Sequence, residues 1–534
     1  MKKRRIIGLF FALLPVLIFA QGEAKARKAM LHATKYMVEN VSTNGGYVWY
    51  YTPDLSRRWG EMEAYNTMIW VQGPGTVSMG QTFINAYITT GNEYYYKAAE
   101  KAAAALIWGQ SSAGGWNYMI DFGGDRSFKN WYSTIGKNAW RLEEFQHYYG
   151  NDTYDDDVTS SAARFLLKMY LTKLDPKYKP ALDKAIDLVI KSQYSIGSWP
   201  QRFPLRYDFN KNGNPDYSSY STFNDDVIWE NVNFLIQYYI TLGEEYFLDH
   251  IMRGMNFYII SQQRNGAWGQ QYNMQMEPDG ARTYEPKALL PGTTYSNALL
   301  LLKFYEYTGN RKFLNGVPDA IQWLEKVKLP KSQTDNGRYT HSTFVELDTD
   351  KPIYVHREGS NNIYGRYYVD YTDEDLLSHY RGKMTIRLEN LKKEYNHISG
   401  LTPEEVTRNS PLKPMKYEGS TTPQSYFFEI WGSKSSIPEK EKVKEIINSL
   451  DIENRWLVKN AMISNPFIGD GENKELTKKF ASTFVGDNRD TSPYRDESDK
   501  LYISSAEYIK NMTILIGYIN SFSNEKGGMT ANVE

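Results

Sequence analysis

The fold is decided by a stretch that begins Ala86-Tyr87-Ile88-Thr89-Thr90-Gly91, continues as an alanine-rich segment from Tyr94 to Trp108, and ends in Gln110 and the turn Gly114-Gly115-Trp116. Both segments carry apolar residues at the three- and four-residue spacing of one helix face. The chain turns at Gly91 between them and again at the Gly-Trp turn after them. This stretch therefore predicts two helices packed as a hairpin.

The same pattern recurs along the chain. Gly-rich turns that lead to a tryptophan start at residues 45, 114, 197 and 266, so that successive turns are 69, 83 and 69 residues apart. Further helical segments are Phe165 to Tyr170, Tyr178 to Ile190, Phe234 to Gly243, Tyr246 to Ile260, Asn297 to Gly309 and Phe313 to Val327, the last pair without a Gly-Trp ending. Repeated hairpins close into a barrel or stack as a solenoid. We expect a mainly all-α protein, an α/α barrel (toroid), whose Gly-Trp turns gather at the end that carries the cleft.

The ends of the chain differ from this repeat. Residues 1–20 begin with four basic residues followed by a short apolar run, the layout of a secretory signal peptide, which predicts a secreted or periplasmic protein. We expect residues 22–400 to form the barrel and residues 401–534 to form a less regular C-terminal extension of unknown role. Helical patterns return there and just before it, at Glu374 to Tyr395, Glu439 to Leu450 and Ser504 to Phe522.

Composition excludes several classes of protein. The chain has no cysteine, so disulfides and thiolate metal sites are excluded. The formal net charge is -1, so that no overall field favours nucleic acid or, once the signal is removed, a membrane. An anionic substrate would have to be met by a local basic cleft.

Two acidic turns stand at expected helix starts. One is Asp155-Asp156-Asp157, and the other is Asn224-Asp225-Asp226. Carboxylates at a helix start can cap the helix and complement its dipole, or they can supply hard oxygen ligands for calcium. Capping needs only one carboxylate, so three in a row favour a metal site at the first turn without excluding the cap.

A further acidic segment, over residues 208–216, matches the start of an EF-hand loop but has Ser219 where the final glutamate would stand. It is either a structural calcium loop or an Asx-rich turn, and its candidate ligands are Asp208, Asn210, Asn212 and Asp216.

Two more motifs complete the set of candidate residues. One is Gly197-Ser198-Trp199-Pro200-Gln201, and the other is Ala281-Arg282-Thr283-Tyr284-Glu285. Arginines follow at Arg357 and Arg381. Taken singly, an arginine is more often a solvated surface residue than part of a site.

Taken together and in this order, the motifs resemble those of the pectate lyases of polysaccharide lyase family ten. The resemblance spans roughly residues 152–381, and its specificity lies in the succession of W-P-Q, T-F-N-D and A-R-x-Y-E. It implies a barrel of helical hairpins, a polyuronate substrate such as pectate, calcium dependence and cleavage by β-elimination. The residues it implies are Asp155 and Asp225 for calcium, Arg282 as catalytic base, and Arg357 and Arg381 for substrate. Beside them, Asp156 of the acidic turn is a further candidate calcium ligand. Trp199, Gln201, Trp268 and Tyr284 are further candidates for substrate binding.

The sequence also departs from that family pattern. Asp156, Asp157 and Asp226 replace less acidic residues, and His356 replaces an aspartate beside Arg357. A more acidic cleft favours calcium but repels a polyuronate that is not bridged by metal. Two other functions remain open. A glycoside hydrolase on the same barrel would use Asp155 or Asp156 with Asp225 or Glu285 as its two carboxylates, and a non-catalytic protein would only bind glycans.

Overall fold

The computed structural model describes residues 22–206, 216–242, 245–377, 381–413, 438–471 and 486–530. The expected signal peptide therefore lies outside the described residues, as do three of the four candidate ligands in the 208–216 loop. No helix within the described ranges has both the length and the apolar character needed to cross a bilayer.

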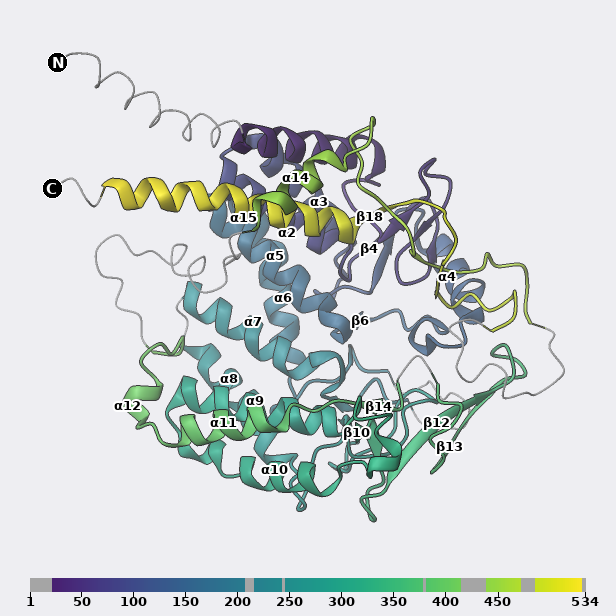
Figure 1. The fold of residues 1–534 in the computed structure, drawn as a ribbon, viewed down its shortest axis with the longest axis vertical. Helices are drawn as coiled ribbons and strands as arrows, with labels where there is room; N and C mark the ends of the chain where they lie inside the picture. Colours follow the sequence, from purple (N-terminus) through teal and green to yellow (C-terminus); the bar gives the residue numbers. More distant parts are fainter. Residues whose placement is uncertain are drawn as a thin grey trace, which may run out of the picture.

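Four helical hairpins follow one another, as the repeat predicted. They are α2 (Thr76–Thr90) with α3 (Glu93–Gly109), α5 (Val158–Lys173) with α6 (Lys179–Ser192), α7 (Val227–Leu242) with α8 (Tyr246–Ile260), and α9 (Pro291–Thr308) with α10 (Val317–Lys326). Helix α5 packs between α2 and α7, and α9 packs against α8 and α11 (Leu388–Ser399). Figure 1 shows these hairpins layered one after another in chain order. The expectation of an α/α-barrel protein built from helical hairpins is confirmed.

The link within a hairpin repeats in atomic detail. Gly91 and Gly309 end α2 and α9 in the left-handed region, with φ of 69° and 67°. The next residue caps the helix that follows, since Asn92 accepts a hydrogen bond from the Tyr94 amide and Asn310 accepts one from the Lys312 amide. Glycine adopts this conformation at little cost, so Thr-Gly-Asn fixes where one helix stops and the next begins.

The Gly-Trp turns bind each hairpin to the next one. The indole N–H groups of Trp116, Trp199 and Trp268 each donate to a backbone carbonyl ten residues earlier, in the last turns of the preceding helix. A side chain on the turn glycine would collide with the second helix of the next hairpin, as Gly114 shows against Lys184 of α6. Trp456 repeats the indole bond to Ile446 of α14 (Lys440–Asn448), a further copy that the sequence did not reveal.

Short strand pairs stand beside the Gly-Trp turns. In each of the first three hairpins, the strand that precedes the hairpin's first helix pairs with the strand that follows the next Gly-Trp turn. The pairs are β4 (Met68–Trp70) with β5 (Met119–Asp121), β6 (Asp152–Thr153) with β7 (Arg202–Phe203), and β8 (Ser221–Thr222) with β9 (Gln271–Tyr272). Because the acidic turns follow β6 and β8 directly, this arrangement carries both turns to the same end of the hairpins.

The two ends of the chain meet beside the first hairpin. Strands β1 (Tyr50–Tyr51), β2 (Arg58–Trp59), β3 (Glu63–Ala64), β15 (Leu457–Val458) and β18 (Tyr502–Ser504) form one sheet in the order β15-β18-β1-β2-β3. Helix α15 (Ser505–Thr530) packs along α2 (Figure 1). The hydroxyl groups of Tyr508 and Thr34 are hydrogen-bonded at 2.6 Å, so the extension is joined to the N-terminal helix over residues 22–36.

The region after the last hairpin contains more strand than the sequence predicted. It holds β10 (His341–Ser342), β11 (Phe344–Val345), β12 (Pro352–Glu358), β13 (Arg366–Asp370) and β14 (Lys383–Met384), and β16 (Met462–Ile463) pairs with β17 (Tyr494–Arg495) farther on. The helix expected from Glu374 begins only at Leu388, because Lys383 and Met384 pair with β10 instead. Tertiary pairing here overrides the local helical period. Two short helices, α4 (Asp125–Ser133) and α12 (Pro403–Val406), lie outside the hairpins.

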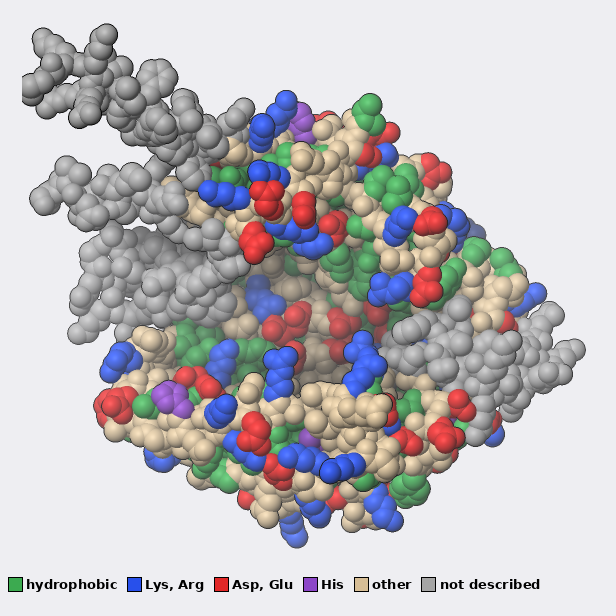
Figure 2. Space-filling model, viewed as in Figure 1, with side chains coloured by type: hydrophobic (Ala, Val, Ile, Leu, Met, Phe, Trp, Pro, Cys, Tyr) green, Lys and Arg blue, Asp and Glu red, His purple; other side chains and the backbone are tan. Residues whose placement is uncertain are grey.

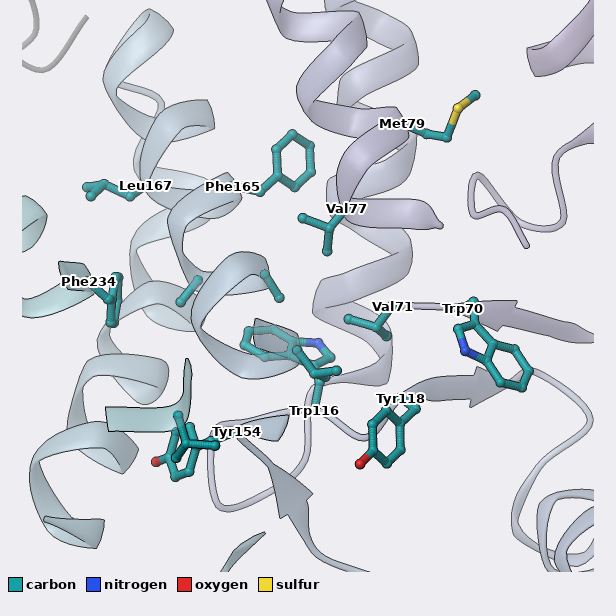
Figure 3. Close-up of a cluster of buried hydrophobic side chains, with 14 of the residues drawn as sticks. Trp70, Val71, Val77, Met79, Trp116, Tyr118, Tyr154, Phe165, Leu167 and Phe234 are labelled. Atoms are coloured by element: carbon teal, nitrogen blue, oxygen red, sulfur yellow. The ribbon is translucent and has the colours of Figure 1, made fainter. Parts of the chain in front are cut away.

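The core fills the space between first helices and the strand pairs. Figure 3 shows Val77 of α2, Phe165 of α5 and Trp116 of the Gly114-Gly115-Trp116 turn packed together above Tyr118. Gly80 of α2 lies directly on the Phe165 ring, with no room for a side chain. Helices α2 and α5 are therefore in close contact, and their N-terminal turns lie near each other.

Candidate active site

The two acidic turns have the same backbone geometry. Turn η4 (Asp155–Asp157) and turn η6 (Asn224–Asp226) contact each other. Each places two consecutive aspartates in the left-handed region, with φ of 50° and 60° at Asp156 and Asp157 and of 50° and 56° at Asp225 and Asp226. Non-glycine residues there cost roughly 1–3 kcal/mol each and persist where the surrounding structure imposes them, most often at functional sites.

These turns form one wall of a cavity of about 490 Å³. Figure 2 shows the hollow between the upper and lower halves of the molecule, with Asp and Glu side chains at its floor. Helices α2 and α5 supply the other walls, and the lining residues that bear on chemistry are Gln72, Asp156, Asp157, Arg164, Asp225 and Asp226. The cavity is strongly acidic, as the sequence led us to expect.

Asp155 does not line this cavity. It is 1% exposed, and its carboxylate accepts hydrogen bonds from the Tyr118 hydroxyl at 2.5 Å and from Gln201 Nε2 at 3.0 Å. The predicted substrate residue Gln201 thus holds Asp155 in place. Beneath them lies Arg202, whose guanidinium stacks on the Tyr118 ring at 5.2 Å. Asp156 takes the position facing the cavity, where its carboxylate accepts from Gln72 Nε2 at 2.6 Å.

Arg282 lies against the acidic turns and is 6% exposed. Arg282 forms a bidentate ion pair with Glu285. Its Nε donates to Glu285 Oε2 at 2.7 Å, and its Nη2 donates to Glu285 Oε1 at 2.8 Å. Its Nη1 lies 3.2 Å from Glu144 Oε2, and its Nη2 lies 3.8 Å from Asp225 Oδ2. The predicted base and the predicted metal ligand Asp225 are therefore neighbours.

Two further carboxylates join this cluster. Glu144 contacts Arg282, and Glu61 comes from the turn between β2 and β3, in the N-terminal segment. Burial, followed by the charges of Asp156 and Glu144, raises the pKa of Glu61 well above its usual value. Within the described part of the chain, Glu61 Oε2 is buried and has no hydrogen-bond donor.

The pKa values of the clustered aspartates are also raised by burial and by neighbouring negative charges. Burial and the Asp155 charge raise the pKa of Asp156 to about 8, and burial and Glu230 raise that of Asp157 to about 7. Burial and the charges of Asp155 and Asp156 raise the pKa of Asp225. Such shifts arise where like charges meet away from water without enough cations.

A calcium ion fits this chemistry, because its ligands are carboxylate oxygens and it would offset the excess negative charge. Within the described ranges, no group of three or more Asp, Glu or His side chains is arranged to hold a metal ion. Calcium takes six to eight oxygen ligands and accepts water and substrate oxygens among them. Asp156 and Asp225, which both face the cavity, could contribute two of those ligands, and water and substrate oxygens would supply the rest.

The aromatic residues predicted to bind substrate lie elsewhere. Trp199, Trp268 and Tyr284 are 0% exposed. The two indoles hold hairpins together, as described above, and Tyr284 packs on Tyr367 with its hydroxyl 3.4 Å from Glu144. None of the three offers a ring face to a sugar, because packing inside the protein covers those faces. The structure corrects this part of the sequence prediction.

The other predicted residues are not brought to the cavity. Arg357, on β12, is 0% exposed and lies 4.2 Å above the Trp140 ring. Arg381 is an exposed residue whose backbone carbonyl accepts a hydrogen bond from Thr343. Of the 208–216 loop only Asp216 is described, and its two oxygens bind the amide and hydroxyl of Ser218. The calcium loop and the substrate roles of both arginines stay predictions.

The sequence reasoning missed Glu61, Gln72, Glu144 and Arg202. For Gln72 a signal existed, since it precedes α2 at the position in the repeat where the acidic turns precede α5 and α7. Glu61 lies outside the segment that carries the family motifs. Glu144 has no counterpart at an equivalent position of another hairpin. Only the path of the chain in space brings these two carboxylates to Arg282 and Asp156.

Comparison with known proteins identifies the family. Residues 121–398, just over half of the chain, match the family described as pectic acid lyase. The chain belongs to the pectic acid lyase family. Membership makes it a polysaccharide lyase, and the matched region holds both acidic turns, Arg282, Glu285 and Glu144. Glu61 and Gln72 come from outside it. No curated protein matches the chain in sequence.

Solved structures with a similar arrangement are distant. A variant of family 10 polysaccharide lyase from Cellvibrio cellulosa, in complex with trigalacturonic acid, is 16% identical with a TM-score of 0.35 over 51% of this chain and 86% of that one. The α-1,6-mannanase from Salegentibacter sp. is 11% identical with a TM-score of 0.31 over 94% and 98%. Cellobiose 2-epimerase from Spirochaeta thermophila is 11% identical with a TM-score of 0.39 over 61% and 75%. At these values the similarities assign neither substrate nor residue roles.

Proposed function

We propose that this member of the pectic acid lyase family cleaves polygalacturonate, or a closely related polyuronate, by β-elimination assisted by calcium. The observation that carries the proposal is the position of Arg282. Its guanidinium lies 3.8 Å from Asp225, one of the two aspartates that face the cavity and carry the calcium prediction. A base at Arg282 and a cation bound by Asp225 would thus be side by side, as proton abstraction next to a carboxylate requires.

The chain's own residues would act at named atoms of the sugar. Arg282 takes the proton from C5, the electron pair forms the C4–C5 double bond, and the C4–O bond breaks. The C4 oxygen leaves with the next sugar and is protonated by solvent. Glu285 and Glu144 orient the guanidinium, which sets its distance to C5. A guanidinium is ordinarily protonated, and only its neutral form can accept the C5 proton, so this mechanism predicts faster turnover at alkaline pH.

Calcium, held by Asp225 and Asp156, would neutralise the charge that grows on the C6 carboxylate as the C5 proton leaves. The same aspartates would repel a polyuronate without it. The departures of this sequence from the family pattern, at Asp156 and Asp157, therefore point to a site that depends on its cation for substrate binding as well as for chemistry.

The test is product analysis on polygalacturonate, on alginate and on a glucuronate polymer, with calcium and with excess chelator. A lyase gives an unsaturated uronate that absorbs in the ultraviolet. A glycoside hydrolase gives new reducing ends without that absorbance, and a glycan-binding protein gives neither. Reducing ends without ultraviolet absorbance on every polymer would refute the lyase reaction, and full activity in chelator would refute the calcium.

We propose further that the protein acts outside the cytoplasm, and the basic-then-apolar layout of residues 1–20 supports this. The lack of cysteine is compatible with either compartment. Cell fractionation with N-terminal sequencing tests the point, and a mature protein that still begins at residue 1 in the cytoplasm would contradict it.

A further inference from the structure

A second pocket lies next to the reaction centre and has no part in the proposed reaction. Its volume is about 280 Å³. The segment that leads into β5 separates it from the acidic cluster. Tyr118 reaches Asp155, whereas its neighbours Asn117 and Met119 line the second pocket. The residues that line this pocket and those that line the acidic cavity do not overlap.

The rim of this pocket carries an aromatic ring in an unusual position. Trp108, in the last turn of α3, is 59% exposed although it is the largest side chain there. Phe122 supports it from one side, with ring centroids 4.4 Å apart. Phe128 and Tyr148, in contact with each other, line the same pocket. A supported but exposed indole provides a rigid apolar face with little conformational entropy to lose on binding.

Two residues that line the pocket each have a buried oxygen without a donor. Asp121 is 6% exposed, and its Oδ1 accepts from the Thr67 hydroxyl and the Gly123 amide while its Oδ2 accepts from no described group. Asn151 is 7% exposed, and its Nδ2 donates to the Pro204 carbonyl while its Oδ1 has no donor. Buried polar atoms without hydrogen-bond partners are rare in proteins, so each of these two oxygens is expected to accept a hydrogen bond from a group outside the described chain. A hydroxyl group of a bound ligand, or a trapped water, would supply that donor.

We propose that this pocket binds a neutral sugar residue, whose hydroxyl groups donate to Asp121 and Asn151 and whose C–H face packs on Trp108. The acceptors set the specificity. The Asp152 carboxylate lines the same pocket, so that with Asp121 the wall is negative and repels a uronate carboxylate. The protein would thus hold an uncharged sugar beside a cavity that takes a charged one. This inference does not depend on the lyase reaction.

The experiment measures binding to the full chain in excess chelator, which removes the cation needed at the acidic cavity. The probes are α-1,4-linked galactotriose and trigalacturonate, which differ only at C6, and the method is calorimetric titration supported by ligand-observed NMR. The variants are Trp108→Ala, Trp108→Phe and Asp121→Asn. The matched control is Tyr246→Ala, which removes an equally exposed aromatic ring, 59%, at the start of α8.

We expect galactotriose to bind the parent at least about tenfold more tightly than trigalacturonate, a difference of about 1.4 kcal/mol. Trp108→Ala should abolish the binding of galactotriose, Trp108→Phe should restore part of it, and Asp121→Asn should reduce the preference for the neutral trisaccharide. Tyr246→Ala should match the parent. No binding of galactotriose by the parent, or unchanged binding by Trp108→Ala, would overturn the proposal. Since chelator is present and no turnover is measured, failure of the lyase proposal would leave this result intact.

Discussion

Arg282 and Glu285 form a two-point ion pair across a single turn of chain, with Nε to Oε2 at 2.7 Å and Nη2 to Oε1 at 2.8 Å, and both side chains are almost fully buried. A pair at this spacing on the surface would contribute roughly 0–1 kcal/mol. Here the pair is part of a buried cluster with Glu144 and Asp225, so its role is to hold the guanidinium in one orientation. The predictions below begin from this cluster.

Replacing Arg282 should abolish most turnover. Lysine lacks the planar fork that meets Glu285 at two points, and alanine lacks any base. We expect Arg282→Lys and Arg282→Ala each to lose at least about a hundredfold in turnover, the lower range for loss of a positioned base. Initial rates by ultraviolet absorbance at several pH values are the measurement.

Removal of one partner from a buried pair also destabilises a protein, by roughly 3–5 kcal/mol. Circular dichroism of each Arg282 variant must therefore show an intact fold at the assay temperature. Glu285→Gln is the matched variant, since it keeps the guanidinium and should lose less turnover than Arg282→Lys. An Arg282→Ala enzyme that folds and works within tenfold of the parent would remove Arg282 from the mechanism.

Calcium binding should depend on the aspartates that face the cavity. We expect Asp225→Asn and Asp156→Asn to weaken calcium binding at least about tenfold, or about 1.4 kcal/mol, because each removes one charged ligand. Calorimetric titration with calcium alone measures this without any substrate. Magnesium should bind more weakly, as it prefers a small octahedral site.

The control is Asp175→Asn, which keeps a side chain that can cap the turn at residues 176–178, at the opposite end of α5 from the acidic turn Asp155–Asp157. It should bind calcium like the parent. Parent-like affinity in Asp225→Asn and Asp156→Asn together would contradict the assignment of the cation site.

The metal-free protein should lose stability as pH rises from about 4 to about 8. The pKa of Asp156 is raised to about 8 and that of Asp157 to about 7, so in this window the folded state holds protons that the unfolded state has released. The free energy of unfolding then falls as pH increases, because the unfolded state binds fewer protons. Thermal unfolding in chelator across this range is the measurement.

Two comparisons sharpen that experiment. Added calcium should make the free energy of unfolding depend less on pH, because the bound ion neutralises the aspartates in place of protons. Glu61→Gln removes one acidic group from the cluster and should raise the melting temperature in chelator at pH 8 relative to the parent. A melting temperature that rises with pH in chelator would show that the cluster is not crowded with charge.

Trp199 should matter for stability and not for substrate affinity. Its indole N–H donates to the Val189 carbonyl at 2.8 Å inside the core. In Trp199→Phe this hydrogen bond is lost, although the Ser192 hydroxyl still donates to the same carbonyl at 3.2 Å. A lost hydrogen bond typically costs about 0.5–1.5 kcal/mol, and a small cavity adds to the loss. We expect a lower melting temperature with an unchanged Michaelis constant for polygalacturonate at a temperature where the variant is folded. An increase in the Michaelis constant alone would return Trp199 to the substrate-binding surface.

The sequence determined the helical hairpins, because local signals fix them. Helix α8 begins and ends at Tyr246 and Ile260, as the apolar period predicted, and Thr-Gly-Asn stops one helix and caps the next. The sequence also determined the family motifs, since Arg282, Glu285 and Asp225 belong to a matched stretch. Tertiary structure alone decided which side chains meet and which are buried. Glu61 reaches Asp156 because both ends of the chain form a sheet beside the first hairpin. Trp199 faces the core, and Asp156 rather than Asp155 faces the cavity, because packing between hairpins sets the direction of each side chain, which a linear pattern does not encode.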